Sequence, residues 1–94
     1  MKLNKRNKSL ILANLKFVIK ITKPSGVVLR RLSRIKKISF NYCKRHFQIG
    51  DKIKLLVIYK PGIHNEGIYT EWSEFMKAWE AFTEESLIKD ALTY

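Results

Sequence analysis

The sequence predicts an α+β fold: a small, curved antiparallel β-sheet of four to five strands, open or barrel-like, with a C-terminal amphipathic α-helix. Three observations lead to this class. Residues 16–22 follow a period of two, residues 53–60 are almost entirely apolar, and from Trp72 the apolar period becomes 3.6 residues. The connections between these segments are short, which favours antiparallel pairing.

Residues 16–32 are typical of a β-hairpin. Phe17, Ile19 and Ile21 point to one side of a strand, and mostly polar residues stand between them. Residues 23–26 then read Lys-Pro-Ser-Gly, with proline at the second and glycine at the fourth position of a tight turn. The apolar residues that follow predict the return strand.

Residues 37–43 allow two interpretations. Ile38, Phe40 and Tyr42 alternate with smaller side chains, and this aromatic and β-branched content favours a strand. A helix over residues 32–43 is the alternative, because a set of its residues also falls on one helical face. That set is Leu32, Ile35, Ser39, Tyr42 and Cys43.

Gly50-Asp51 predicts a hairpin turn that leads into a strand over residues 53–60. That strand is apolar on both faces, so we expect it in the centre of the sheet, paired with a short strand over 68–70. Residues 47–53 also resemble the hairpin that opens a strand in many SH3-like and OB-type barrels. The resemblance implies a small barrel of a kind often used to bind nucleic acid or protein.

The C-terminal third is helical in pattern. Apolar residues at positions i, i+3, i+4, i+7 and i+10 form one wide stripe, and we expect it to belong to the core. Those residues are Trp72, Phe75, Met76, Trp79 and Phe82. Ile88 leaves the stripe, so a second short helix is expected to start near Thr83.

The chain of 94 residues predicts a single domain over 1–94, with residues 1–9 as a flexible basic arm. The longest apolar stretch near the start, residues 10–18, is interrupted by Asn14 and Lys16 and is too short to span a membrane. Cys43 is the only cysteine, so no internal disulfide can form. We expect a cytoplasmic protein that does not bind membranes.

Charge is the strongest signal in the composition. The formal net charge is +11, and it is sorted along the chain. Residues 1–60 hold 17 basic residues and one acid, Asp51, whereas residues 61–94 hold two basic and seven acidic residues. A bias in genome composition inflates lysine without sorting charges along a chain, so this polarity needs a physical reason.

The most basic stretch, residues 30–37, is the main part of the candidate binding site, with Lys44 and Arg45 beside it. Its cations can neutralise phosphates, and the aromatic rings between them can stack on unpaired bases. The candidate residues are Arg30, Arg31, Arg34, Lys36, Lys37, Phe40, Tyr42, Lys44 and Arg45.

No pattern indicates an enzyme, a metal site or a cofactor. Cys43, His46 and Asp51 form the only local set of a nucleophile, a base and an orienting group, and no glycine-rich elbow or phosphate loop accompanies them. Cys43, His46 and His64 give at most three ligands from cysteine and histidine, whereas a structural zinc needs four.

The sequence therefore favours a small, basic, non-catalytic protein that binds nucleic acid, RNA or DNA, with little sequence specificity. The alternative is a protein–protein interaction module, such as a small regulator or inhibitor whose basic part binds an acidic partner protein.

Overall fold

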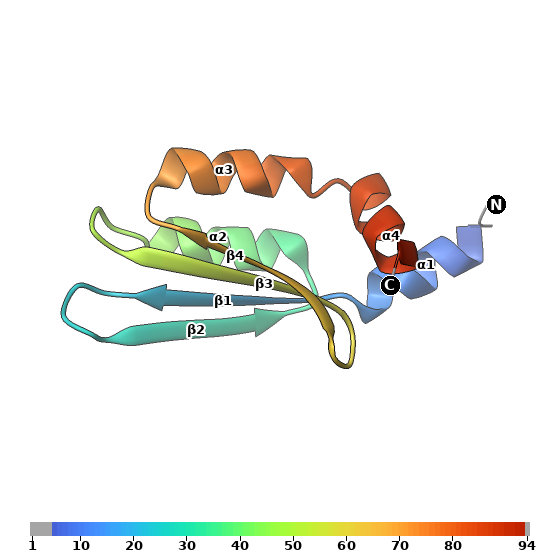
Figure 1. Cartoon of the computed structure of the whole chain (residues 1–94), viewed down its shortest axis with the longest axis horizontal. Coiled ribbons are helices and arrows are strands. Elements are labelled where there is room, and N and C mark those ends of the chain that lie inside the picture. The colour runs from blue at the N-terminus through green and yellow to red at the C-terminus, as the bar shows by residue number, and fades with distance from the viewer. Residues whose placement is uncertain (1–4, 94) are drawn as a thin grey trace.

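The computed structural model describes residues 5–93, which form four helices and one four-stranded sheet (Figure 1). In chain order the elements are α1 (Lys5–Asn14), β1 (Lys16–Thr22), β2 (Val28–Ser33), α2 (Lys36–His46), β3 (Lys52–Lys60), β4 (Ile63–Tyr69), α3 (Trp72–Ala81) and α4 (Glu84–Thr93). The predicted α+β class with a C-terminal helix is confirmed.

The sheet has the strand order β2-β1-β3-β4, and every neighbouring pair is antiparallel. β1 and β3 are central, as the apolar character of residues 53–60 predicts, and Ile19 lies opposite Leu55 at the middle of their ladder. β2 and β4 are edge strands, so the sheet is open and the barrel-like option does not occur. The order strand–strand–helix appears twice, first as β1-β2-α2 and then as β3-β4-α3.

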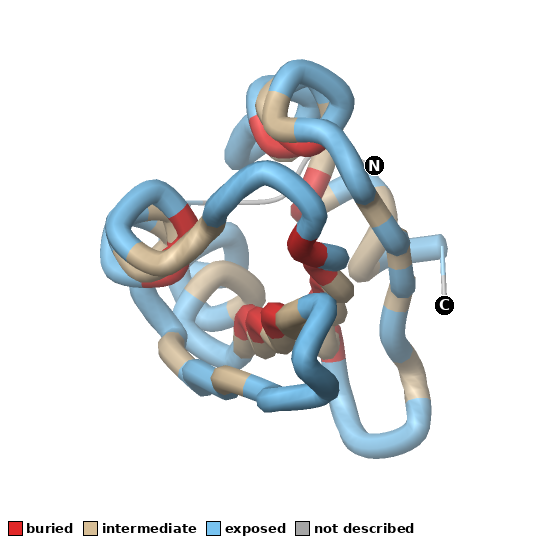
Figure 2. The backbone as a smooth tube through the Cα atoms, turned by 90° about the vertical axis from the view of Figure 1, so that its left-hand side faces the viewer, coloured by how far each residue is buried: buried red, intermediate tan, exposed pale blue. Residues whose placement is uncertain are grey.

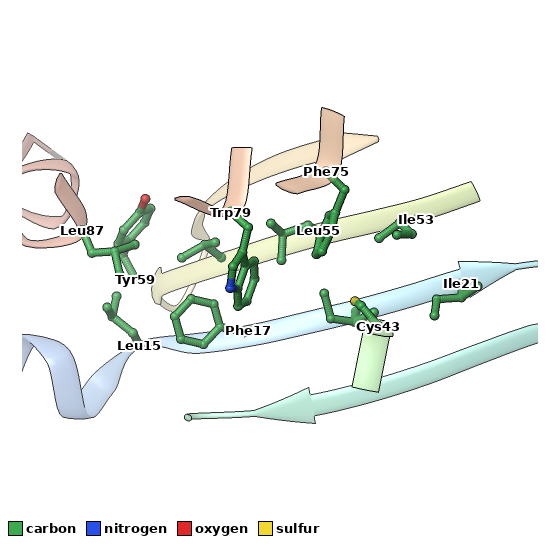
Figure 3. Close-up of a cluster of buried hydrophobic side chains, with 12 residues drawn as sticks. Leu15, Phe17, Ile21, Cys43, Ile53, Leu55, Tyr59, Phe75, Trp79 and Leu87 are labelled. Carbon is green, nitrogen blue, oxygen red and sulfur yellow. The ribbon is translucent and has the colours of Figure 1, made fainter. Parts of the chain in front are cut away.

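The core lies on one face of this sheet. β1 buries Phe17, Ile19 and Ile21 there, and β3 buries the side chains at every second position from Ile53 to Tyr59. Residues from α2 and α3 complete the cluster, with Cys43 and Phe75 fully buried (Figure 3). Both helices therefore cover the same face of the sheet (Figure 2).

The strand predicted over residues 37–43 is wrong, and the alternative helix is correct with shifted bounds, as α2. The buried residues of this segment are Ser39 and Cys43, which are four residues apart, as on a helix. Topology gives the physical reason. β2 and β3 run parallel with β1 between them, and such a connection needs a crossover, usually a helix. An extended segment laid over the buried face of the sheet would leave its backbone N–H and C=O groups without partners, whereas a helix satisfies them internally.

α3 confirms the predicted helix from Trp72, and α4 confirms the second helix. Trp79 is buried, and its ring lies 5.6–6.0 Å from those of Phe17, Phe40 and Phe75. Trp72 is half-buried and packs against the core cluster. The apolar stripe of α3 thus covers the sheet, as expected for core residues.

α1 and α4 lie together beyond one end of the sheet (Figure 1). Residues 5–9, expected in a flexible arm, form the first half of α1, whose residues are exposed or half-buried; residues 1–4 of that arm lie outside the described part. No helix within residues 5–93 has the length and apolar content needed to cross a membrane.

Two predicted turns are present, but one connects different elements. In the β1–β2 turn the N–H of Gly26 donates to the carbonyl of Lys23 over 2.9 Å, and Gly26 has a φ of +93°. The Gly50-Asp51 turn joins α2 to β3 and so is not part of a hairpin. The second hairpin lies further on, where β4 begins at Ile63, five residues earlier than predicted.

An ion pair fastens these two turns together. Asp51 is 2% exposed, and its carboxylate pairs with the ammonium of Lys23. The same carboxylate accepts the backbone N–H of Gln48 over 2.9 Å, and Lys23 also donates to the carbonyl of His46 over 2.7 Å. The buried carboxylate of Asp51 and the half-buried ammonium of Lys23 are therefore both hydrogen-bonded, as a charge removed from water requires.

Replacement of Trp79 by alanine is expected to destabilise the domain by about 3–5 kcal/mol, since it removes a buried ring that contacts both helices and β1. Domains of this size have a total stability of about 5–15 kcal/mol, so the loss is severe. Chemical denaturation measures it. Leu32→Ala, at a side chain that is 59% exposed, is the control and should change stability little. An unchanged midpoint for Trp79→Ala would contradict the core assignment.

Stability is expected to fall in acid through Asp51. Burial raises the pKa of Asp51, but the hydrogen bonds from Lys23 and Gln48 and the charge of Lys23 outweigh it and hold the pKa below its ordinary value. This stabilisation is complete above the ordinary pKa of aspartate, about 3.9, and is lost as the pH falls through the lower native pKa.

Melting temperatures from pH 7 to pH 2 test this expectation. The difference between the wild type and Asp51→Asn should be constant above about pH 5 and should shrink below about pH 4. Glu85→Gln changes an exposed acid on α4 and serves as the control. A difference that persists unchanged to pH 2 would show that the carboxylate charge of Asp51 does not stabilise the fold.

Candidate nucleic-acid interface

The second face of the sheet carries no helix, and we call it the open face. Every second strand residue points there, opposite in direction to the buried side chains. No helix lies over it in either view of the chain (Figures 1 and 2). The open-face residues are Lys16, Val18, Lys20, Thr22, Val28, Arg30, Leu32, Lys52, Lys54, Leu56, Ile58, His64, Glu66 and Ile68.

Three cations stand side by side across the open face. Lys20 lies directly opposite Arg30 of β2 on one side and Lys54 of β3 on the other. Directly opposed like charges destabilise a sheet. Lys54 is partly neutralised by Glu66, at 2.8 Å, whereas Lys20 and Arg30 make no ion pair within residues 5–93. This cationic row therefore places unbalanced positive charge at the centre of the sheet.

The cationic row borders a shallow hollow. Its walls are the three cations together with Val18 and Leu56, and its volume is about 270 Å³. Val18 and Leu56 belong to an aliphatic row one step along the strands, which Leu32 extends across β2. The charged groups of the cationic row thus lie beside aliphatic side chains on a surface that no helix covers.

More positive charge lies on the far side of the aliphatic row. Lys16, Arg34 and Lys60 line a larger hollow of about 630 Å³ at the end of the sheet, together with Asn14 and the Pro61-Gly62 turn. Lys16 and Lys20 are four residues apart on β1, which is about 13 Å along a strand. Cations therefore flank the aliphatic row on both sides.

The predicted site residues are divided among several surfaces. Arg30 belongs to the open face, whereas its neighbour Arg31 points to the other side of the edge strand β2 and is exposed. Arg34 lies in the connection between β2 and α2. The structure does not gather the three arginines at one turn.

The side of α2 that faces the core carries Lys36, Phe40 and Tyr42. The Lys36 ammonium lies 5.3 Å from the ring centre of Trp79 and donates to the carbonyl of Phe82, and burial lowers its pKa. Phe40 and Tyr42 are half-buried against the core cluster, so their rings are not placed beside the cationic row. Lys36 and Phe40 therefore link α2 to α3.

The remaining candidates lie on the outer side of α2. Lys37, Lys44 and Arg45 are exposed and lie opposite the buried Ser39 and Cys43 on the helix. We call the surface formed by Lys37, Lys44 and Arg45 the helix face. It stands on the helix-covered side of the sheet and is therefore separate from the open face.

Sequence reasoning missed Lys20 and Lys54 as site residues. The signal was available, because Lys20 alternates with Ile19 and Ile21 and so had to point away from the core. The sequence pattern does not show which strands pair or in what register. Only the register places Lys20 between Arg30 and Lys54.

Cys43 and His46 are three residues apart on α2 and differ in their surroundings. The thiol of Cys43 is buried in the core, whereas the ring of His46 lies 4.5 Å from that of Tyr42. Within residues 5–93 no three side chains among His, Cys, Asp and Glu gather as metal ligands would. Burial also raises the pKa of Cys43 to about 12, so the thiolate that acts as nucleophile or ligand is disfavoured.

Comparison of the chain with protein-family models, with curated proteins and with solved structures finds no match.

Native Cys43 is expected to resist thiol reagents. With the pKa raised to about 12 and no exposed surface, labelling by a maleimide at pH 7.5 should proceed only through unfolding, and should become complete in denaturant. Mass spectrometry after timed labelling measures this. Rapid, complete labelling of the native protein would show that α2 does not seal this part of the core.

Proposed function

We propose that the protein binds the phosphate backbone of nucleic acid through the open face. The observation that carries the proposal is the cationic row Arg30–Lys20–Lys54, held in direct register across three strands on a surface that no element covers. The row destabilises the free protein, and a polyanion laid across it would relieve the repulsion. Sites that violate a local rule of stability are often functional ones.

The cations are positioned for phosphates rather than for base edges. The open face carries Lys and Arg but no Asn or Gln, the amide side chains that read adenine. It carries no Phe, Tyr or Trp either, and His64 is the one ring among the open-face residues, so it offers little aromatic surface on which single-stranded bases can stack. These residue types support backbone contact with little sequence preference, and they favour a duplex over a single strand.

A protein partner with an acidic surface is the second candidate. The exposed aliphatic side chains of the open face favour it, since Leu32 and Ile68 are 59% and 57% exposed. Such side chains are common at the centres of protein interfaces. Binding to nucleic acid at low salt separates the two candidates. The first candidate requires such binding, whereas a protein that acts only on an acidic protein partner does not.

Binding to a duplex is expected to depend strongly on salt. If about five phosphates are contacted, log K should fall against log salt with a slope of about −4 to −5. Fluorescence anisotropy of a labelled duplex between about 50 and 200 mM salt measures the slope, with single strands in parallel. Absence of binding at the lowest salt would remove the proposed function.

Charge reversal on the open face is expected to weaken this binding about 10-fold or more. Lys20→Glu with Arg30→Glu changes the charge of the cationic row, while Lys5→Glu with Arg6→Glu changes the net charge equally on α1. All four side chains project away from the core, so both variants should remain folded. Equal loss of affinity in the two variants would mean that net charge, and not the open face, governs binding.

A further inference from the structure

We propose that the helix face of α2 binds a second nucleic-acid segment, so that one molecule bridges two segments. This inference rests on the proposed function of the open face. It begins from the observation that one small chain exposes two cationic surfaces on opposite sides of its sheet. Either surface alone would explain binding of one segment, and the presence of both allows one molecule to contact two.

The helix face has a fixed orientation. Ser39 and Cys43 are fully buried against the sheet, so Lys37 and Lys44 lie on the outward side of the helix, one on each side of Asn41 along the chain. Lys37 and Arg45 are eight residues apart, or about 12 Å along a helix axis. The three cations therefore form a stripe that can follow a phosphate backbone, on a helix whose only other outward polar residue in that stretch is Asn41.

The helix face has no internal counter-charge. α3 packs beside α2 and carries Glu74 and Glu80, yet Lys37, Lys44 and Arg45 make no ion pair within the described chain. By contrast, the cations that stabilise the fold are paired or partly buried, as Lys23 and Lys36 are. The charges of the helix face are left available to an external anion.

The two surfaces are far enough apart to act separately. The chain measures 24 and 20 Å across its two shorter axes, and the sheet with its helix layer lies between the surfaces. At physiological salt the Debye length is about 8 Å. A polyanion bound on the open face therefore leaves the charge of the helix face largely unneutralised, and a second segment is still attracted.

Energy transfer between two duplexes tests the bridge. The duplexes have 12 base pairs and carry either a donor or an acceptor label. Each is about 41 Å long, close to the 47 Å long axis of the protein, so one protein surface covers about one duplex. At about 50 mM salt, energy transfer should rise as wild-type protein is added. It should fall again when the protein concentration exceeds the duplex concentration, because each duplex is then bound by its own protein molecules and no molecule is shared between two duplexes.

The informative variant is Lys37→Glu with Lys44→Glu and Arg45→Glu. Its matched control is Lys5→Glu with Arg6→Glu and Lys8→Glu, which changes the net charge equally on exposed residues of α1. The two variants should bind a single duplex within about threefold of each other. Energy transfer should fall to background in the helix-face variant and persist in the α1 control.

The outcomes are distinct. If the wild type binds no duplex, the proposed function fails and this inference with it. If the wild type binds one duplex without energy transfer, or if the helix-face variant still bridges, the bridge through α2 alone is overturned. Sedimentation of the free protein should give a monomer. A dimer that disappears in the helix-face variant also overturns the inference, because a second copy then occupies that surface. Should the glutamate variant fail to fold, the glutamine substitutions at the same positions replace it.

Discussion

β1 and β3 pair along their length, and this pairing aligns their buried side chains on one face of the sheet. The remaining architecture depends on that alignment. An apolar sheet face must be covered, and two amphipathic helices cover it, α2 as the crossover between β2 and β3 and α3 after the second hairpin. Both helices cover the same face of the sheet, so the open face has no helix over it. Contact with solvent or with a ligand, and not packing against a helix, therefore determines which residues suit the open face.

Local patterns in the sequence were sufficient for most of this architecture. The period of two at Phe17, Ile19 and Ile21 gave β1, the apolar run of residues 53–60 gave a central strand, and the period of 3.6 from Trp72 gave α3. The error at residues 37–43 came from a segment whose side chains fit both periods. Its state was decided by chain connectivity, which no short window of sequence contains.

The candidate site was less predictable for the same reason. Arg30 was identified because it stands in a basic run, whereas Lys20 and Lys54 are isolated in sequence and meet only through strand register. Phe40 shows the reverse case, since it stands among cations in the sequence but packs against Trp72 and Trp79 in the fold. The uneven charge along the chain becomes a spatial division, with cations on the open face and α2 and acids mainly on α3 and α4.

The repeated order of strand, strand and helix has a consequence for the integrity of the chain. The unit β1-β2-α2 and the unit β3-β4-α3 meet along the central ladder, and each contributes part of one shared core. Their only covalent link is residues 47–51, in which Phe47 is half-buried, residues 48–50 are exposed and Asp51 is buried. Separated, each half would expose an apolar strand edge and half of a core, so neither is a domain. The molecule is in effect an intramolecular dimer of two incomplete halves. If the chain were cleaved at residues 48–50, burial of the shared core and pairing of β1 with β3 would favour reassociation of the two fragments.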